Sequence, residues 1–124
     1  MRALRPLVAI VLLAAGATAC SGDSTASLPT PNKAFCQAAY DFDTNSPKLI
    51  GKIAQQTTLV QRMADNAPAD VRADARTYLD AMQRRARGDT SVVDNPRVKQ
   101  AVENVERRAV NGCALYKQDP PSGM

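Results

Sequence analysis

From residue 33 to residue 117, apolar side chains recur every three or four positions, and no stretch of strand length alternates apolar with polar residues. A period near 3.6 places apolar groups on one face of a helix, whereas a strand needs a period of two. A chain with this pattern can bury its apolar faces only by packing helix against helix. The sequence therefore predicts an all-α fold.

Capping signals divide this region into four predicted helices. Asn32 precedes a short apolar stripe and is a good cap for the first helix. The pairs Ser46-Pro47 and Asn95-Pro96 each place a capping residue before a proline in the first turn, which predicts the starts of the second and fourth helices. Pro68 ends the second helix, and Arg87-Gly88 ends the third.

Short connections favour antiparallel neighbours, so we expect an up-down-up-down bundle with a short first helix. The second helix is predicted to carry Ile50, Ile53 and Val60 on its buried stripe. The core is rich in alanine and has no tryptophan, and a small core of this kind benefits from a covalent staple. This topology brings the start of the first helix beside the end of the fourth, which predicts one disulfide between Cys36 and Cys113.

The first nineteen residues have the order of a secretory signal. Arg2 and Arg5 precede an apolar run, which ends in the small residues Ala17-Thr18-Ala19. Residues 7–19 supply 13 apolar or small positions, fewer than the roughly 20 that a membrane-spanning helix needs. Residues 1–19 are therefore predicted to be a signal peptide that is cleaved after Ala19.

The sequence "ATAC" at residues 17–20 resembles a bacterial lipobox, in which the cysteine after the cut receives the lipid. Ala17 departs from that pattern, where leucine or another larger aliphatic residue is usual. Lipidation of Cys20 would also remove an odd thiol from an exported protein with three cysteines. We expect a lipid on Cys20, which the mass of the mature N-terminus tests. The alternative is an ordinary signal-peptidase site that leaves Cys20 unmodified.

The mature chain is long enough for one small domain. Residues 20–32 hold the lipidated cysteine and a tether rich in Ser, Thr and Pro, which has too few apolar groups to fold. Residues 33–117 form the helical domain, and residues 118–124 are predicted to be a disordered tail. Without Arg2 and Arg5 the net charge falls from +4 to +2, which is too small to indicate nucleic-acid binding.

The sequence offers little apparatus for catalysis. It contains no histidine, which is the commonest general base and transition-metal ligand, and no glycine-rich phosphate loop. The candidate carboxylates for acid-base or calcium chemistry are Asp41, Asp43, Asp65 and Asp70. Carboxylates near helix ends more often act as caps or solvated charges, and no run has the calcium-loop pattern. We therefore expect no catalytic residue, no metal site and no cofactor.

Two basic clusters have different expected environments. Arg84, Arg85 and Arg87 end the third helix, at the end of the bundle far from the tether. They are expected either to offset the helix dipole or to meet an acidic envelope protein or an anionic wall polymer. Arg107 and Arg108 descend toward the tether on the fourth helix. That pair is expected to help the domain dock on anionic lipid head groups.

The lipobox-like Cys20, the polar tether, "AFC" at residues 34–36 and "NGC" at residues 111–113 together resemble small exported lipoproteins of actinobacteria, most of them uncharacterised. The resemblance implies attachment to the outer face of the cell membrane and implies no substrate. It leaves two candidate functions, a non-catalytic interaction module or a carrier of a small apolar ligand. A sizeable apolar cavity would favour the carrier. Met63 and Met82 could line such a cavity, although core filling is the commoner role of methionine.

Overall fold

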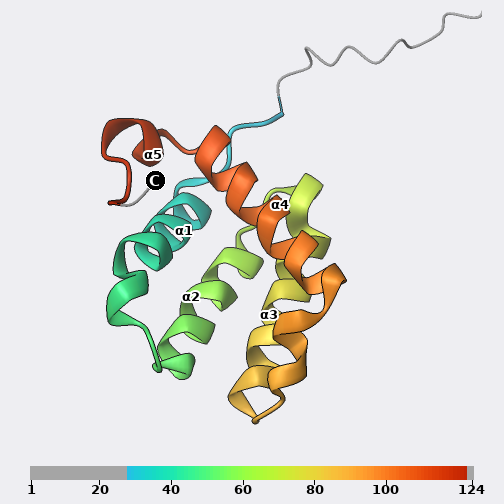
Figure 1. The fold of residues 1–124 in the computed structure, drawn as a ribbon. Coiled ribbons are helices and arrows are strands. Elements are labelled where there is room, and N and C mark those ends of the chain that lie inside the picture. The colour runs from blue at the N-terminus through green and yellow to red at the C-terminus, as the bar shows by residue number, and fades with distance from the viewer. Residues whose placement is uncertain (1–27, 123–124) are drawn as a thin grey trace, which may run out of the picture.

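The computed structural model describes residues 28–122, which form α-helices joined by short 3-10 helices and loops (Figure 1). No strand occurs in this range, so the all-α prediction is confirmed. In chain order the elements are α1 (Lys33–Asn45), η1 (Ser46–Lys48), α2 (Ile53–Asp65), η2 (Ala69–Val71), α3 (Arg72–Ala86), η3 (Thr90–Asp94), α4 (Pro96–Gly112) and α5 (Ala114–Gln118).

Each long helix packs against the next one along the chain, which confirms the up-down-up-down bundle. The helices α1, α2 and α3 lie side by side, and α4 crosses at an angle (Figure 1). The carboxyl end of α4 lies near the amino end of α1, whereas its amino end lies against α3 and η3. The bundle is therefore closed most tightly at the end where α1 begins.

Three of the predicted helix boundaries have the expected geometry. The Asn32 side chain accepts a hydrogen bond from the Phe35 backbone N–H at 2.8 Å and caps α1. Asn95 caps α4 in the same way, accepting from the Arg97 N–H at 2.9 Å. Gly88 follows α3 with φ of +94°, a left-handed conformation that glycine adopts without strain.

The predicted start of the second helix is wrong. Ser46 and Pro47 open only the single turn η1, and α2 begins at Ile53. Between them Gly51 has φ of +77°, which interrupts the helical path. Ile50, expected on the buried stripe, is 79% exposed, while Leu49 is buried. A cap followed by proline fits the first turn of a 3-10 helix as well as that of an α-helix, so the signal does not determine which of the two follows.

The core is built from all four long helices and closed by α5. Its most enclosed large side chains include Phe35, Val60 and Val105, and alanines fill many of the remaining contacts. The short helix α5 is not predicted by the sequence as a separate element. Cys113 adopts an extended conformation between α4 and α5. Tyr116 of α5 then packs edge-on against Tyr40, with ring centroids 5.6 Å apart.

Residues on both sides of the predicted domain pack against it. Pro31 and Pro121 are buried. The Tyr40 hydroxyl donates a hydrogen bond to the Asp119 carboxylate at 2.8 Å. The folded unit thus takes in the last residues of the predicted tether and the first residues of the predicted tail. Proline suits such contacts because it adds apolar surface without a backbone N–H that needs a partner.

The predicted signal peptide and Cys20 lie outside the described residues. Among the helices of residues 28–122, none combines the length and the hydropathy needed to cross a bilayer.

Candidate functional site

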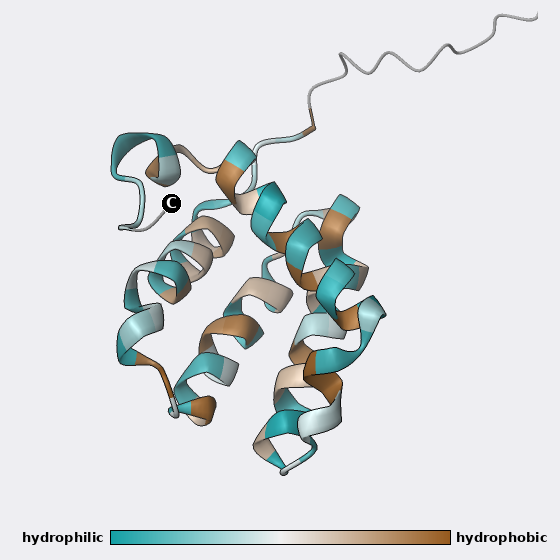
Figure 2. Ribbon diagram, in the orientation of Figure 1, coloured by the Kyte–Doolittle hydropathy of each residue, from teal (hydrophilic) through white to brown (hydrophobic). Residues whose placement is uncertain are grey.

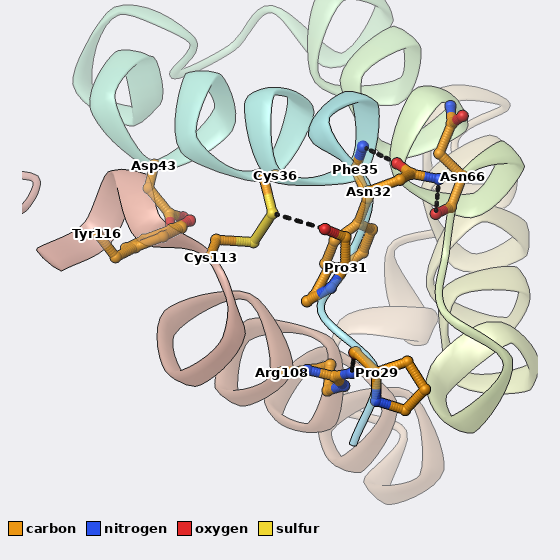
Figure 3. The surroundings of a disulfide bond; sticks show 10 residues. All are labelled: Pro29, Pro31, Asn32, Phe35, Cys36, Asp43, Asn66, Arg108, Cys113 and Tyr116. Carbon is orange, nitrogen blue, oxygen red and sulfur yellow. Dashed lines mark hydrogen bonds between the residues drawn. A yellow bond between two sulfur atoms is a disulfide. The ribbon is translucent and has the colours of Figure 1, made fainter. Parts of the chain in front are cut away.

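A disulfide joins Cys36 near the start of α1 to Cys113 at the end of α4, which confirms the predicted pairing (Figure 3). The two Cα atoms are 5.5 Å apart, and both cysteines are buried. The bond links residues 77 positions apart and fixes α4 to α1 at this end of the bundle.

Beside the disulfide, Arg108 is buried and bound on two sides. Its Nε donates to the Asp70 carboxylate at 2.8 Å, and its Nη2 donates to the Pro29 carbonyl (Figure 3). A Cβ on Gly112 would come within 2.5 Å of the guanidinium and 2.9 Å of the Pro31 ring, so the glycine leaves room for both. Arg108 therefore holds the incoming chain to α4 and is buried, whereas Arg107, the other member of the predicted membrane-docking pair, is exposed.

The other end of the bundle contains a cavity of about 400 Å³, open to solvent between α3, η3 and α4 and reaching α1 and α2. At this end of the bundle α4 lies over α3 and is farther from α1 than at the other end (Figure 1). We call this cavity the distal groove. It is lined by Phe42, Gln56, Tyr78, Ala81, Met82, Arg85, Val92, Val93, Val98, Lys99, Val102 and Glu103. Its volume falls in the range of small-molecule sites, about 300–1,000 Å³.

The surface of the distal groove is mostly apolar. Phe42 and Tyr78 meet edge to face with ring centroids 6.2 Å apart. Valines of η3 and α4 complete the surface, and Figure 2 shows hydrophobic segments on the facing helices. Met82 lines the groove, whereas Met63 lies in the core and does not reach it. A second and larger hollow, of about 660 Å³, lies beside Arg108 and is lined by charged side chains of both signs, so its surface is as polar as it is apolar.

Four polar side chains reach the distal groove, and three of them have no partner in residues 28–122. Gln56 donates to the Leu49 carbonyl at 2.5 Å. Arg85, Lys99 and Glu103 are exposed and make no side-chain hydrogen bond or ion pair within the described range. The groove thus carries two free cations and one free carboxylate on an apolar surface.

The three arginines predicted to form one patch lie in three different environments. Arg84 binds the Asp89 carboxylate at 2.8 Å and lies 4.0 Å from that of Asp80. Arg85 lines the distal groove, and Arg87 is exposed just beyond the end of α3. The three arginines lie at the expected end of the bundle, but they do not form one equivalent surface.

A second cluster of polar groups lies between α1, α4 and α5. The Tyr116 hydroxyl, which lies beside Asp43 in Figure 3, donates to the Asp43 carboxylate. Glu106 lines the same small cavity. Burial raises the pKa of Asp43, although the Tyr116 hydrogen bond opposes that rise. Partial desolvation raises the pKa of Glu106, and the carboxylates of Asp43 and Glu103 raise it further. Nowhere in residues 28–122 do three side chains of metal-ligand type converge.

Because the pKa of Glu106 is raised, we expect Glu106→Gln to raise the melting temperature at pH 7 only slightly, since the side chain is exposed and water screens its charge. A carboxylate whose pKa is raised by folding adds stability below its unfolded pKa, near 4, and that stability is lost as pH rises through the folded pKa. Thermal unfolding between pH 4 and pH 7 measures the difference, which should shrink toward pH 4. Asp94→Asn is the control, because Asp94 is an exposed carboxylate of η3 that does not line this small cavity. A constant difference across this range would contradict the prediction.

Comparison with protein families, with characterised proteins and with solved structures gave no match. The function is therefore argued from the geometry of this chain.

Proposed function

We propose that this chain binds a small, largely apolar ligand and is held at the outer face of the cell membrane by a lipid on Cys20. The observation that carries the proposal is the distal groove, an apolar cavity large enough for one small molecule. The anchor is supported by the signal-like first nineteen residues and by the lipobox-like sequence that ends at Cys20.

Two features of the fold suit the distal groove to binding. Valine, methionine and aromatic side chains surround it, so a ligand would remove apolar surface from water on both sides of the contact. The disulfide fixes α1 and α4 at the opposite end of the bundle. Such a constraint lowers the entropy lost when a ligand is bound, because fewer conformations of the site are available beforehand.

The interaction-module alternative has weaker support. One surface that could serve such a module is the cluster of Arg84, Arg85 and Arg87, but Arg84 is already paired with acidic residues of the same chain. The proposed role is binding without catalysis, which agrees with a sequence that contains no histidine.

The test is titration with N-phenyl-1-naphthylamine, a neutral dye that fluoresces in apolar surroundings. We expect saturable binding by the wild type and at least tenfold weaker binding by Val102→Phe, whose larger ring fills the groove. Val110→Phe is the matched control, because Val110 is also a partly buried valine of α4 but does not line the groove. The proposal fails if the wild type does not bind the dye, or if Val102→Phe binds it as well as the wild type does.

A further inference from the structure

We infer that the ligand of the distal groove is a single amphiphile with an anionic end, of the class of a medium-chain carboxylic acid. This inference rests on the proposed function and narrows the class of ligand. The apolar body lies among the valines and aromatic rings, and the anion lies beside Arg85 and Lys99 at the mouth.

The two cations come from two different helices that line the groove. Arg85 lies seven residues after Tyr78 and three after Met82, so it continues the face of α3 that lines the groove. Lys99 follows Val98 on α4. Both side chains are exposed. Long basic side chains of this kind rest their carbon stems on apolar surface and keep the charge in water, at the rim of the cavity.

Neither cation is bound to another side chain within residues 28–122. Arg85 and Lys99 form no side-chain hydrogen bond or ion pair with any other part of residues 28–122, whereas neighbouring Arg84 holds Asp89 at 2.8 Å. Burial raises the pKa of Tyr78, the carboxylates of Glu106 and Asp43 raise it further, and the Arg85 charge opposes this rise. The Arg85 charge therefore acts on an aromatic ring that lines the groove, together with two acidic groups. An unpaired guanidinium beside an apolar cavity can form strong charge-assisted hydrogen bonds to a carboxylate.

Glu103 is the one acidic residue in the lining, one turn after Lys99 on α4. It weakens the attraction for an anion, but two cations from two walls outnumber it. Its negative charge also raises the pKa of Glu106, the next acidic residue along α4. Removing the Glu103 charge should therefore strengthen anion binding, which is the opposite of the effect expected at Arg85.

The size of the distal groove favours one small molecule over a peptide helix. An α-helix with side chains is about 10–12 Å across and presents several turns to a partner. A cavity of about 400 Å³, bounded by four helices and η3, is too small to hold several turns of such a helix. Charge and volume together indicate a compact anionic amphiphile.

The test is displacement of the bound dye by dodecanoate, dodecanol and dodecyltrimethylammonium, each below its micelle concentration. We expect dodecanoate to bind about tenfold more tightly than dodecanol, and the cationic amphiphile to bind most weakly. Added salt should reduce the advantage of dodecanoate.

The variants separate the roles of the charges. Arg85→Gln and Lys99→Gln should each weaken dodecanoate severalfold without changing dodecanol, and Glu103→Gln should strengthen dodecanoate. Arg87→Gln is the matched control, because Arg87 is an exposed arginine outside the lining. If dodecanol equals dodecanoate, or if the cationic amphiphile binds best, the anionic class is overturned while the proposed function stands. Failure of the dye itself to bind would instead overturn the proposed function.

Discussion

Replacing Cys36 and Cys113 together by alanine should lower the free energy of unfolding by about 4 kcal/mol. The disulfide closes a loop of 77 residues, and in the chain-entropy model its loss frees the unfolded chain to adopt many more conformations. Domains of this size are commonly stable by only about 5–15 kcal/mol, so the variant should unfold at a much lower denaturant concentration.

Equilibrium unfolding in urea measures this effect. Wild-type protein unfolded and refolded with a thiol reductant should match the double variant, because both lack the cross-link. A loss below about 1 kcal/mol would mean that helix packing alone holds the two ends together and that the disulfide adds little to stability.

Arg108→Ala should cost about 2–3 kcal/mol, because it leaves the Pro29 carbonyl and the Asp70 carboxylate without their donor. Arg108 is only 9% exposed, but the Asp70 side chain is 28% exposed, and water can solvate part of the carboxylate that remains. Urea unfolding measures the change. Lysine at position 108 should recover only part of the loss, since an ammonium lacks the planar fork of a guanidinium.

Arg107→Ala is the matched control, because Arg107 is the exposed neighbour on the same helix. It should change stability by less than about 0.5 kcal/mol. Equal effects at the two positions would restore the view of Arg107 and Arg108 as an equivalent surface pair. Limited proteolysis adds a second readout, because Arg108→Ala should make the chain near Pro29 easier to cleave.

The sequence is informative where local chemistry decides the structure. Asn32 and Asn95 cap helices because their side chains reach backbone N–H groups a few residues away, and the sequence alone reveals that spacing. The apolar stripes then determine the number of long helices. Short connections determine their antiparallel order, and that order brings Cys36 and Cys113 together.

The distal groove could not be predicted in the same way. It exists because α4 crosses the bundle at an angle, and no local pattern states that angle. In the sequence, Met82 and Met63 both lie on apolar helical stripes, and nothing distinguishes the methionine that lines the groove from the one in the core. Likewise, Arg84 and Arg85 are adjacent in the chain, but only the fold shows that, within residues 28–122, one is paired and the other is free.

Arg108 did leave a signal in the sequence. It lies on the helical face shared by Ala101, Val105 and Gly112, at spacings of three and four residues. A basic residue on such a face needs a partner, because burying an unpaired charge is costly. The pattern could have suggested a buried arginine with an acidic partner, but it could not name Asp70 and Pro29, which come from distant segments.

The contact between Pro29 and Arg108 also determines how the domain bears mechanical load. Tension applied through the amino-terminal segment enters the fold at Pro29 and passes through the guanidinium to α4. It also passes along the backbone to α1, a few residues from the Cys36–Cys113 bond. Both routes meet at the covalently closed end of the bundle. Pulling on the chain therefore loads the end fastened by a covalent bond. The segments that line the distal groove, which include α3, η3 and the amino-terminal half of α4, lie outside the direct line of force.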